Sequence, residues 1–409
     1  MYNEITKCRI SGSSNLVTVL SLGNQYLTGV FPKTKEEQVV KGPVDLVWCP
    51  DSGLLQMKQT YNLNAMYGDN YGYRSGLNSS MVKHLQEKIK YLESLTELYE
   101  NDVVIDIGSN DATSLKAYSG KHKKFGIDPT GEKFKQYYTD DITLIPDFFN
   151  SQIVEEKFNS EKAKIITSIA MFYDLESPME FVENIERCLA DDGIWHFEQS
   201  YMPSMLNANS YDTICHEHLE FYSLKVVKDM LDKKGLRIIN VQMNAINGGS
   251  FAVTACKKRA KHVSEQRNID ILLSQENEMG LDTLQPYREF EERAKEHRRN
   301  LIELIEGLVA DGKKVFGYGA STKGNVLLQY CGFTAKQIAY IAEVNEDKFG
   351  AYTPGTLIPI ISEAEANEMN PDYYLVLPWH FKENILAREQ AYLAKGGKFI
   401  FPFPAVEII

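Results

Sequence analysis

Apolar and polar positions follow different periods along the chain, and these periods predict its elements. Residues 1–75 mix glycine, proline, serine and aromatic residues without a sustained helical period, which indicates a small module of loops and short strands. A helical spacing then places Leu85, Ile89, Leu92 and Leu95 on one face of a predicted helix. The pattern therefore predicts that an irregular N-terminal module gives way to regular structure after residue 75.

Apolar runs of strand length dominate residues 76–260, where they are separated by helical or turn-rich segments. The runs read VVIDIG, KFGIDP, TLIPDFF, AKIITSIAMF, GIWHFEQS, LRIINVQM and SFAVTACK. Strands that alternate with helices form a doubly wound sheet with a mostly parallel core. We therefore predict a central α/β domain with a Rossmann-like sheet.

Residues 261–311 are highly charged and have a long helical period, as in REFEERAKEHRRNLIELIEGLVADG, which predicts a solvated helical connector. Residues 312–409 then repeat the pattern of strand, glycine turn and helix, from KKVFGYGAS to KFIFPFP. This pattern predicts a second, smaller Rossmann-like domain. Two glycine-turn domains in one chain suggest two nucleotide-bearing ligands.

The composition is that of an ordinary globular chain of 409 residues, 43% of them hydrophobic, which is enough for several cores. Its net charge of -12 argues against nucleic acid as a partner, although small anionic ligands stay possible. We find no run of about 18 apolar residues and no basic, then apolar, leader, so we expect a cytoplasmic, soluble protein without a membrane partner. We also expect a monomer, because the predicted modules can cover one another's faces.

The first glycine turn, VVIDIGSNDA, follows a buried strand, and Gly108 would let the backbone approach a ligand closely. Asp128 ends the next strand, about 20 residues further on, where a carboxylate can accept hydrogen bonds from ribose hydroxyls. This arrangement predicts a site for S-adenosylmethionine (SAM), and the alternative is a turn with no ligand. The candidate cofactor-binding residues are Asp106, Gly108, Ser109, Asn110 and Asp128.

The second glycine turn, VFGYGASTKGNVLLQY, also follows a strand and opens a helix, so its amides and a lysine could hold phosphate oxygens. A further polar turn, KFGAYTPGTLIPI, comes after the next strand, at the edge where such sheets bind ligands. A purely structural turn is the alternative. The candidate substrate-binding residues here are Gly319, Ser321, Lys323, Asn325, Lys348 and Thr353.

The segment CHEHLEFY collects His216, Glu217 and His218 between Cys215 and an aromatic pair. If the segment is extended, the two histidines face one side, and if it turns, all three groups can converge. Two histidines at this spacing could bind zinc from a strand, but no nearby H-x-x-H or D-x-H motif completes a site. We therefore expect no metal here, and a histidine cap on a buried loop is a further alternative.

Eight motifs, taken in order, resemble those of SAM-dependent C-methyltransferases that methylate C3 or C5 of 4-keto-deoxy nucleotide sugars. They are LVWCPDSGLLQ, NYGYRSG, DIGSND, YDTICHEHLEFYSL, NGGSF, GYGASTKGN, YTPGTLIPI and LPWHF. The resemblance spans essentially the whole chain. It implies an N-terminal zinc-binding module, a central SAM domain, and a C-terminal domain that helps to hold the sugar nucleotide.

The resemblance also implies roles for the candidate residues. A base removes a proton beside the 4-ketone, and the enolate attacks the methyl group of SAM in line. His218 is implied as the base, Glu217 as an orienting carboxylate or alternative base, and His216 as the oxyanion donor. Tyr71 and Tyr73 are implied to contact the sugar, Tyr73 within the catalytic group, and we place Tyr222 with the substrate-binding residues. A methyltransferase acting on oxygen or nitrogen would not need such a base, and a nucleotide-sugar binding protein would have no turnover.

Two departures from the family pattern change these expectations. The zinc module usually has C-x-x-C twice, but Ser11 and Ser52 replace its second cysteines and leave Cys8 and Cys49. Serine is a poor zinc ligand, so we expect the fold of the module without stable zinc. Some relatives have a histidine where this chain reads SIAMFYDLESP, so any hydrogen-bonding role there must pass to Tyr173 or be absent.

Overall fold

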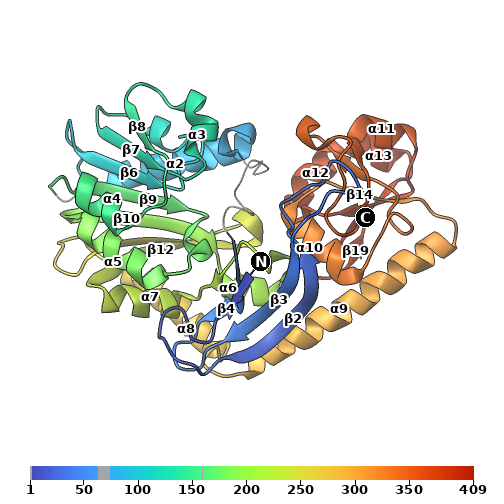
Figure 1. The fold of residues 1–409 in the computed structure, drawn as a ribbon, viewed down its shortest axis with the longest axis horizontal. Coiled ribbons are helices and arrows are strands. Elements are labelled where there is room, and N and C mark those ends of the chain that lie inside the picture. The colour runs from blue at the N-terminus through green and yellow to red at the C-terminus, as the bar shows by residue number, and fades with distance from the viewer. Residues whose placement is uncertain (1, 63–73, 159) are drawn as a thin grey trace.

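The computed structural model describes residues 2–62, 74–158 and 160–409 (Figure 1). It has two lobes, which are joined along one side by the first long strands and by helix α9 (Gln285–Ala310). One lobe holds the central α/β domain, and the other holds the C-terminal domain.

The central domain is built on a seven-stranded sheet, in which the last strand along the chain, β13, runs antiparallel to the other six. The first strand, β6, is buried at all five positions, as expected for a parallel strand with helices on both faces. In sheet order the strands are β12 (Leu236–Asn244), β13 (Ser250–Lys257), β10 (Leu189–Ser200), β9 (Ala163–Ile169), β6 (Val103–Ile107), β7 (Lys123–Ile127) and β8 (Ile142–Ile145).

Helices cover this sheet with their apolar faces. In α2 (Ser79–Leu95) the buried residues are Leu85, Ile89 and Leu92, as the helical spacing predicts. The other helices of the domain are α3 (Gly131–Phe134), α4 (Ser151–Lys157), α5 (Pro178–Cys188), α6 (Met202–Asn207), α7 (Leu224–Lys233) and α8 (Gln266–Glu278). Because β7 and β9 flank β6 on opposite sides, the chain changes direction across the sheet at the carboxyl end of β6.

The C-terminal domain repeats this plan on a six-stranded sheet with an antiparallel edge strand. Its strands, in sheet order, are β16 (Ile360–Ser362), β15 (Ile341–Glu343), β14 (Val315–Tyr318), β17 (Tyr373–Val376), β18 (Lys398–Phe401) and β19 (Glu407–Ile408). Its helices are α10 (Thr322–Cys331), α11 (Glu363–Glu368), α12 (Lys382–Arg388) and α13 (Gln390–Ala394). The predicted fold class, a central and a smaller C-terminal Rossmann-like domain after an irregular module, is confirmed.

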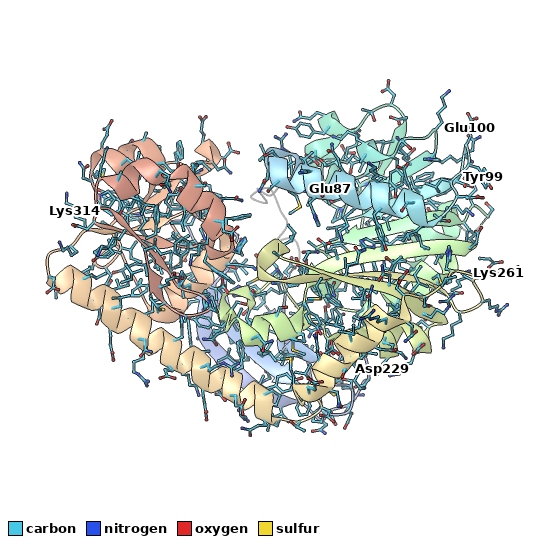
Figure 2. The ribbon with its side chains drawn as sticks, turned by 180° about the vertical axis from the view of Figure 1, so that it is seen from behind. Glu87, Tyr99, Glu100, Asp229, Lys261 and Lys314 are labelled. Atoms are coloured by element: carbon cyan, nitrogen blue, oxygen red, sulfur yellow. The ribbon has the colours of Figure 1, made fainter. Side chains whose placement is uncertain are left out.

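Both sheets point their carboxyl ends inward. Figure 2 shows Tyr99 and Glu100, which precede β6, at the outer margin of one lobe. Lys314, which directly precedes β14, lies at the outer margin of the other lobe. The two strands therefore run toward the middle of the molecule, and doubly wound sheets bind their ligands at these ends.

The N-terminal module connects the two lobes. Its four-stranded sheet consists of β2 (Val17–Tyr26), β3 (Lys41–Trp48), β4 (Leu55–Met57) and β11 (Glu220–Phe221), and β1 (Tyr2–Glu4) pairs with β5 (Gln59–Tyr61). Leu46 and Trp48 belong to the same core as the C-terminal domain, whereas Cys8 and Cys49 belong to the core of the central domain. The module therefore fixes the two lobes to each other.

Helix α9 differs from the solvated connector that its charge predicts. Tyr287, Phe290, Leu301 and Ile305, at helical spacing, are fully or almost fully buried in the core shared with the C-terminal domain. The charged residues occupy its outer face, so the composition of the helix concealed an amphipathic structural element.

No helix in the described part of the chain combines the length and apolar character needed to cross a bilayer.

Candidate active site

A cavity of about 1770 Å³ lies where the inward ends of the two sheets meet. It is lined by Gly108 and Asp128 of the central domain, by Gly319 of the C-terminal domain, and by Phe31 of the N-terminal module. Pockets for one drug-sized ligand measure about 300–1,000 Å³, so this cavity has room for two ligands together.

The five predicted cofactor residues all line the central-domain part of the cavity. Gly108 has a φ of +74°, and a Cβ there would come within 3.0 Å of Met171, so the turn favours glycine. The Asp128 carboxylate accepts hydrogen bonds from the Asn110 N–H at 2.8 Å, and from the Thr130 N–H and hydroxyl at 2.7 and 2.6 Å. A close backbone turn beside a braced carboxylate fits the ribose and amino-acid parts of SAM.

Asp106 stands behind this turn and is almost completely buried. Burial, with a smaller contribution from the nearby Asp128, raises the pKa of Asp106 to about 7, although the Thr167 hydroxyl donates a hydrogen bond to it at 2.5 Å. The apolar side of the same region includes Ile127, Phe148 and Met171. The residues present therefore fit a bound SAM molecule.

Glu198, at the end of β10, is a cavity residue that the sequence analysis missed. His84 contacts its carboxylate at 2.6 Å, Lys88 at 3.0 Å and Asn244 at 2.9 Å. Burial alone would raise the pKa of Glu198, but the contacts with His84 and Lys88 outweigh it and hold the pKa below the usual value. The two basic residues lie one turn apart on α2, a spacing that could have drawn attention to them.

The CHEH segment is a turn that leads into β11, and it presents two of its three ionisable groups to the cavity. Glu217 and His218 line the cavity together with Cys215. His216 is not among the lining residues, is fully buried, and packs its ring edge-on against Tyr61 at 4.6 Å. Neither the extended segment nor the turn with three converging groups describes this arrangement. Glu217 and His218 lie together at the cavity, and His216 lies apart from them.

His218 is held in one tautomer. Its Nδ1 lies 2.7 Å from the Thr213 carbonyl oxygen, which can only accept, so Nδ1 carries the proton and Nε2 keeps the lone pair of the neutral ring. Tyr173 packs edge-on against the ring at 4.5 Å. Burial lowers the pKa of His218 to about 4, and nearby Lys323 contributes, so the imidazole is neutral at pH 7. This is the form that a general base requires.

Glu217 is the second acid–base candidate. Burial raises the pKa of this carboxyl above its ordinary value. The Thr28 hydroxyl lies 3.5 Å from its Oε2, and a Cβ placed on Gly29 would come within 2.9 Å of its Oε1. The N-terminal module thus approaches the carboxylate closely and limits where it can lie.

Several predicted site residues lie elsewhere. Tyr222 is fully buried and stacks on Phe172 at 5.2 Å, in the core of the central domain, so its position gives no support to its assignment to substrate binding. The position of His216 likewise gives no support to its predicted role as oxyanion donor. Tyr71 and Tyr73 lie outside the residues that the structure describes.

The C-terminal part of the cavity contains Gly319, Ser321, Lys323 and Lys348 from the predicted set. Two others are buried and are not among the lining residues. Asn325 is fully buried, and its amide donates to the Thr28 carbonyl at 2.7 Å. Thr353 is also fully buried, and its hydroxyl contacts Thr356 at 2.6 Å and accepts from the Ile358 N–H at 2.9 Å. A polar residue in a turn motif therefore did not imply a place in the cavity lining.

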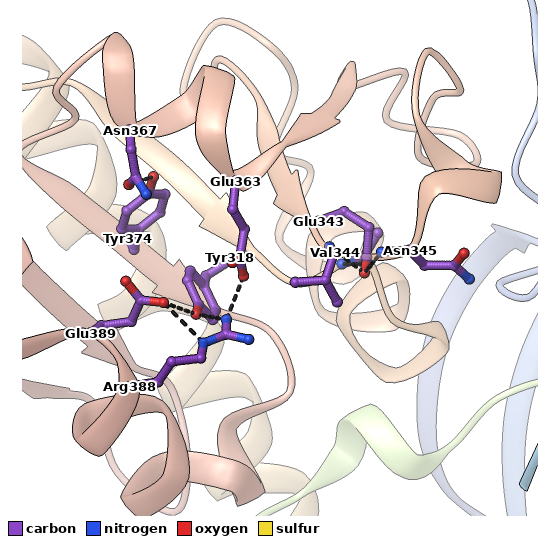
Figure 3. A network of polar contacts seen from close by, with 10 residues as sticks. Tyr318, Glu343, Val344, Asn345, Glu363, Asn367, Tyr374, Arg388 and Glu389 are labelled. Atoms are coloured by element: carbon purple, nitrogen blue, oxygen red, sulfur yellow. Dashed lines mark hydrogen bonds and ion pairs between the residues drawn. The ribbon is translucent and has the colours of Figure 1, made fainter. Parts of the chain in front are cut away.

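Two polar networks line this domain's end of the cavity (Figure 3). In one, Arg388 contacts Glu363 at 2.5 Å and Glu389 at 3.0 Å and also bonds the Tyr318 hydroxyl. In the other, Glu343 accepts hydrogen bonds from backbone amides. The charge of Arg388 is balanced by two carboxylates, so this arginine is a poor candidate for phosphate binding.

The N-terminal module gathers the four positions of its zinc motif. Cys8 Sγ lies 3.2 Å from Ser52 Oγ, and Ser11 Oγ lies 3.7 Å from Cys49 Sγ. Two sulfurs on one tetrahedral zinc are about 3.8 Å apart, so the positions are suitable but the donors are not, because two are hydroxyls. Among the described residues, no group of three or more His, Cys, Asp or Glu side chains is arranged to hold a metal ion. The residues do not fit a structural zinc.

A buried arginine next to this motif supports the CHEH segment. Arg9 donates to the Met57 carbonyl at 2.6 Å and to the Thr60 hydroxyl at 2.8 Å, and its Nε lies 3.5 Å from Glu220. The Arg9 and Glu220 side chains are 3% and 0% exposed. Because Glu220 follows His218 by two residues, this contact links the end of the CHEH segment to the N-terminal module.

Three family models match successive parts of the chain. They are described as "Putative zinc binding domain" over residues 8–67, "Methyltransferase domain" over 80–241, and "C-methyltransferase C-terminal domain" over 245–404. The C-methyltransferase NovU of Streptomyces niveus is 29% identical over 409 residues, which cover 99% of this chain and 97% of NovU. The similarity to NovU thus extends over nearly the full length of both proteins.

Among solved structures, a SAM-dependent methyltransferase from Aquifex aeolicus is 19% identical, over 44% of this chain and 97% of that one, with a TM-score of 0.32. The mitomycin 7-O-methyltransferase MmcR is 14% identical, over 44% of this chain and 55% of that one, with a TM-score of 0.35. Each match covers less than half of this chain.

Proposed function

Because the chain belongs to the SAM-dependent C-methyltransferases that have an N-terminal zinc-binding-type domain, we propose that it methylates C3 or C5 of a 4-keto-deoxy nucleotide sugar. The observation that carries this proposal is the position of His218. Its ring is a neutral base, and it lines one cavity together with the SAM turn and with the glycine turn of the second domain. A carbon acceptor needs such a base, whereas an oxygen or nitrogen acceptor does not.

The Nε2 atom of His218 removes the proton from the carbon beside the ketone. This carbon-bound proton is acidic because the resulting negative charge is shared with the ketone oxygen. Thr213 holds the opposite nitrogen at 2.7 Å, so the ring cannot turn away while it accepts the proton. Glu217 lies in the same cavity and, with its raised pKa, is the alternative base.

Charge on the enolate oxygen requires a donor or a cation in the cavity. Tyr173 contacts the His218 ring, and Lys323 is close enough to depress the pKa of that histidine. Both residues line the cavity, whereas His216 does not, and we assign them the role of stabilising the charge on the enolate oxygen. Bound SAM supplies an electrophilic methyl group to the carbon that carries the negative charge.

The test is a mass spectrum of 4-keto-6-deoxy nucleotide sugars incubated with the protein in D₂O, with and without SAM. We expect a methylated sugar with SAM and deuterium uptake beside the ketone without it. Methylation on oxygen, or methyl transfer without any deuterium uptake, would contradict the carbanion route. If the uridine, cytidine, guanosine and thymidine substrates all showed no methylation and no deuterium uptake, the proposed substrate class would be contradicted.

A further inference from the structure

A tryptophan of the C-terminal domain contacts the segment that precedes the CHEH turn. Asp212 belongs to the short 3₁₀ helix η5 (Tyr211–Thr213), and Trp379 begins another, η8 (Trp379–Phe381), which follows β17. The Trp379 indole N–H donates a hydrogen bond to Asp212 Oδ2 at 2.8 Å, and the two residues are 9% and 1% exposed. Neither is among the described residues that line the cavity. The second domain therefore holds the central domain at a point outside the ligand site.

The buried Asp212 carboxyl group depends on this indole. Within the described parts of the chain, its Oδ1 has no hydrogen-bond partner. Burial raises the pKa of Asp212, while the nearby Lys323 and the Trp379 hydrogen bond act in the opposite direction. Removing one partner of a buried polar group leaves the other partner with the full cost of its desolvation. Loss of the indole N–H would therefore disturb the position of Asp212.

The indole ring itself is fixed between the two domains. On the central domain, a Cβ placed on Gly248 would come within 3.2 Å of the Trp379 ring. On the C-terminal domain, the centroid of the same ring lies 5.5 Å from that of Phe403. Because both sides of the ring are in contact with their own domain, the N–H points at Asp212 in a defined direction.

The short helix held in this way contains the atom that orients the proposed base. Asp212 directly precedes Thr213, whose carbonyl oxygen accepts the Nδ1 proton of His218 at 2.7 Å. On the other side of Asp212, the Tyr211 hydroxyl contacts Nδ1 of His297 on α9 at 2.9 Å. The side chains of two successive residues thus anchor η5. If η5 moved, the carbonyl oxygen would move with it, and Nε2 of the base would point elsewhere.

We propose that Trp379 is a positioning residue for the base. Through Asp212 and the Thr213 carbonyl, its indole N–H keeps Nε2 of His218 aimed at the carbon from which the proton is removed. In this way the C-terminal domain takes part in the chemical step. A misplacement of about 1 Å can cost about 10²-fold in rate even when the change lies away from the chemistry, so a contact outside the cavity is sufficient. The inference rests on the proposed function, because it takes His218 to be the base.

The test is a double-mutant cycle, in which Trp379→Phe is made in the native chain and in His218→Asn. Phenylalanine keeps an aromatic ring between the domains but has no N–H. In the native chain, we expect the maximal rate of deuterium uptake beside the ketone, measured without SAM, to fall about 10-fold to 100-fold, with KM changed by less than about 2-fold. In His218→Asn the same substitution should change the remaining rate by less than about 2-fold, because the group that it positions is already absent.

Trp195→Phe is the matched control. It also removes a buried indole N–H, which donates to the Ser168 hydroxyl at 2.9 Å in the core of the central domain. This control should leave the exchange rate of the folded protein near the native value. If Trp379→Phe fails to fold, Asp212→Leu breaks the same hydrogen bond from its other side and replaces it in the cycle.

Several results would overturn the inference while the proposed function stands. They are a native exchange rate in Trp379→Phe, an equal loss with and without His218, a loss confined to KM, and an equal loss in Trp195→Phe. Absence of both deuterium exchange and methylation in the native protein would overturn the inference and the proposed function together.

Discussion

The substitution His218→Asn tests the proposed role of His218 as a base separately from its structural role in the turn. An asparagine side chain can place its amide nitrogen near the position of Nδ1 and keep the bond to the Thr213 carbonyl, which is 2.7 Å long in the native chain. It has no group at the position of Nε2. The variant should therefore retain the turn of the CHEH segment and lose only the lone pair that accepts the proton.

The expected loss follows from this assignment. A positioned general base contributes about 10²- to 10⁴-fold, which corresponds to about 2.7–5.4 kcal/mol of activation free energy. At pH 7 the native imidazole, with a pKa of about 4, is fully in its basic form, so the whole contribution is present in the wild type. We expect both deuterium uptake and methyl transfer to fall by this factor, with SAM affinity unchanged because the cofactor residues lie on other strands.

The assay is the rate of deuterium uptake beside the ketone, measured without SAM from pH 5 to pH 8. The active form is the neutral imidazole, which exists above its pKa. The rate should therefore be nearly flat over this range and fall only as the pH drops toward 4. A histidine of ordinary pKa would instead cause a decline below about pH 6.5.

Two results would refute this reasoning. A His218→Asn variant that exchanges deuterium at close to the native rate would show that the base is another residue. A loss of exchange in Glu217→Gln that exceeds the loss in His218→Asn would move the base to Glu217, whose pKa burial raises. In the latter case the native profile should decline at a higher pH than it does for a histidine of pKa about 4.

Other substitutions test the remaining parts of the site. Arg9→Met removes a buried partner of Glu220, so it should lower the free energy of unfolding by about 3–5 kcal/mol and should also lower kcat. The substitution of an exposed residue, Lys7→Met, should change neither quantity. Urea titration measures the first quantity and steady-state kinetics the second. The double substitution Ser11→Cys and Ser52→Cys should give a protein that binds about one zinc ion per chain by elemental analysis and has a higher Tm, while the wild type binds none. Absence of zinc from this variant would contradict the inference that the four motif positions are arranged for a zinc ion. Asp128→Asn should weaken SAM binding about 10-fold by calorimetry, and unchanged affinity would mean that the carboxylate does not bind the ribose.

Local sequence determined the layout of the chain and the SAM half of the site. Strand periodicity located β6, β7 and their neighbours, because buried parallel strands are continuous apolar runs. Parallel strands bring their carboxyl ends to one edge, so the residues after two such strands meet without knowledge of any side-chain contact. That is why Gly108 and Asp128 could be paired from the sequence, and why both line the cavity.

Only the tertiary structure decided which polar residues of the other motifs reach the cavity. His216 and His218 differ in this respect because the segment is a turn, in which alternation along a strand no longer predicts the direction of a side chain. Tyr222 directly follows β11 and is a core residue. The strand β11 joins a sheet whose other strands lie more than 150 residues earlier in the chain. Contacts of this kind, like that of Arg9 with Glu220, depend on packing between distant segments, and no local pattern encodes them.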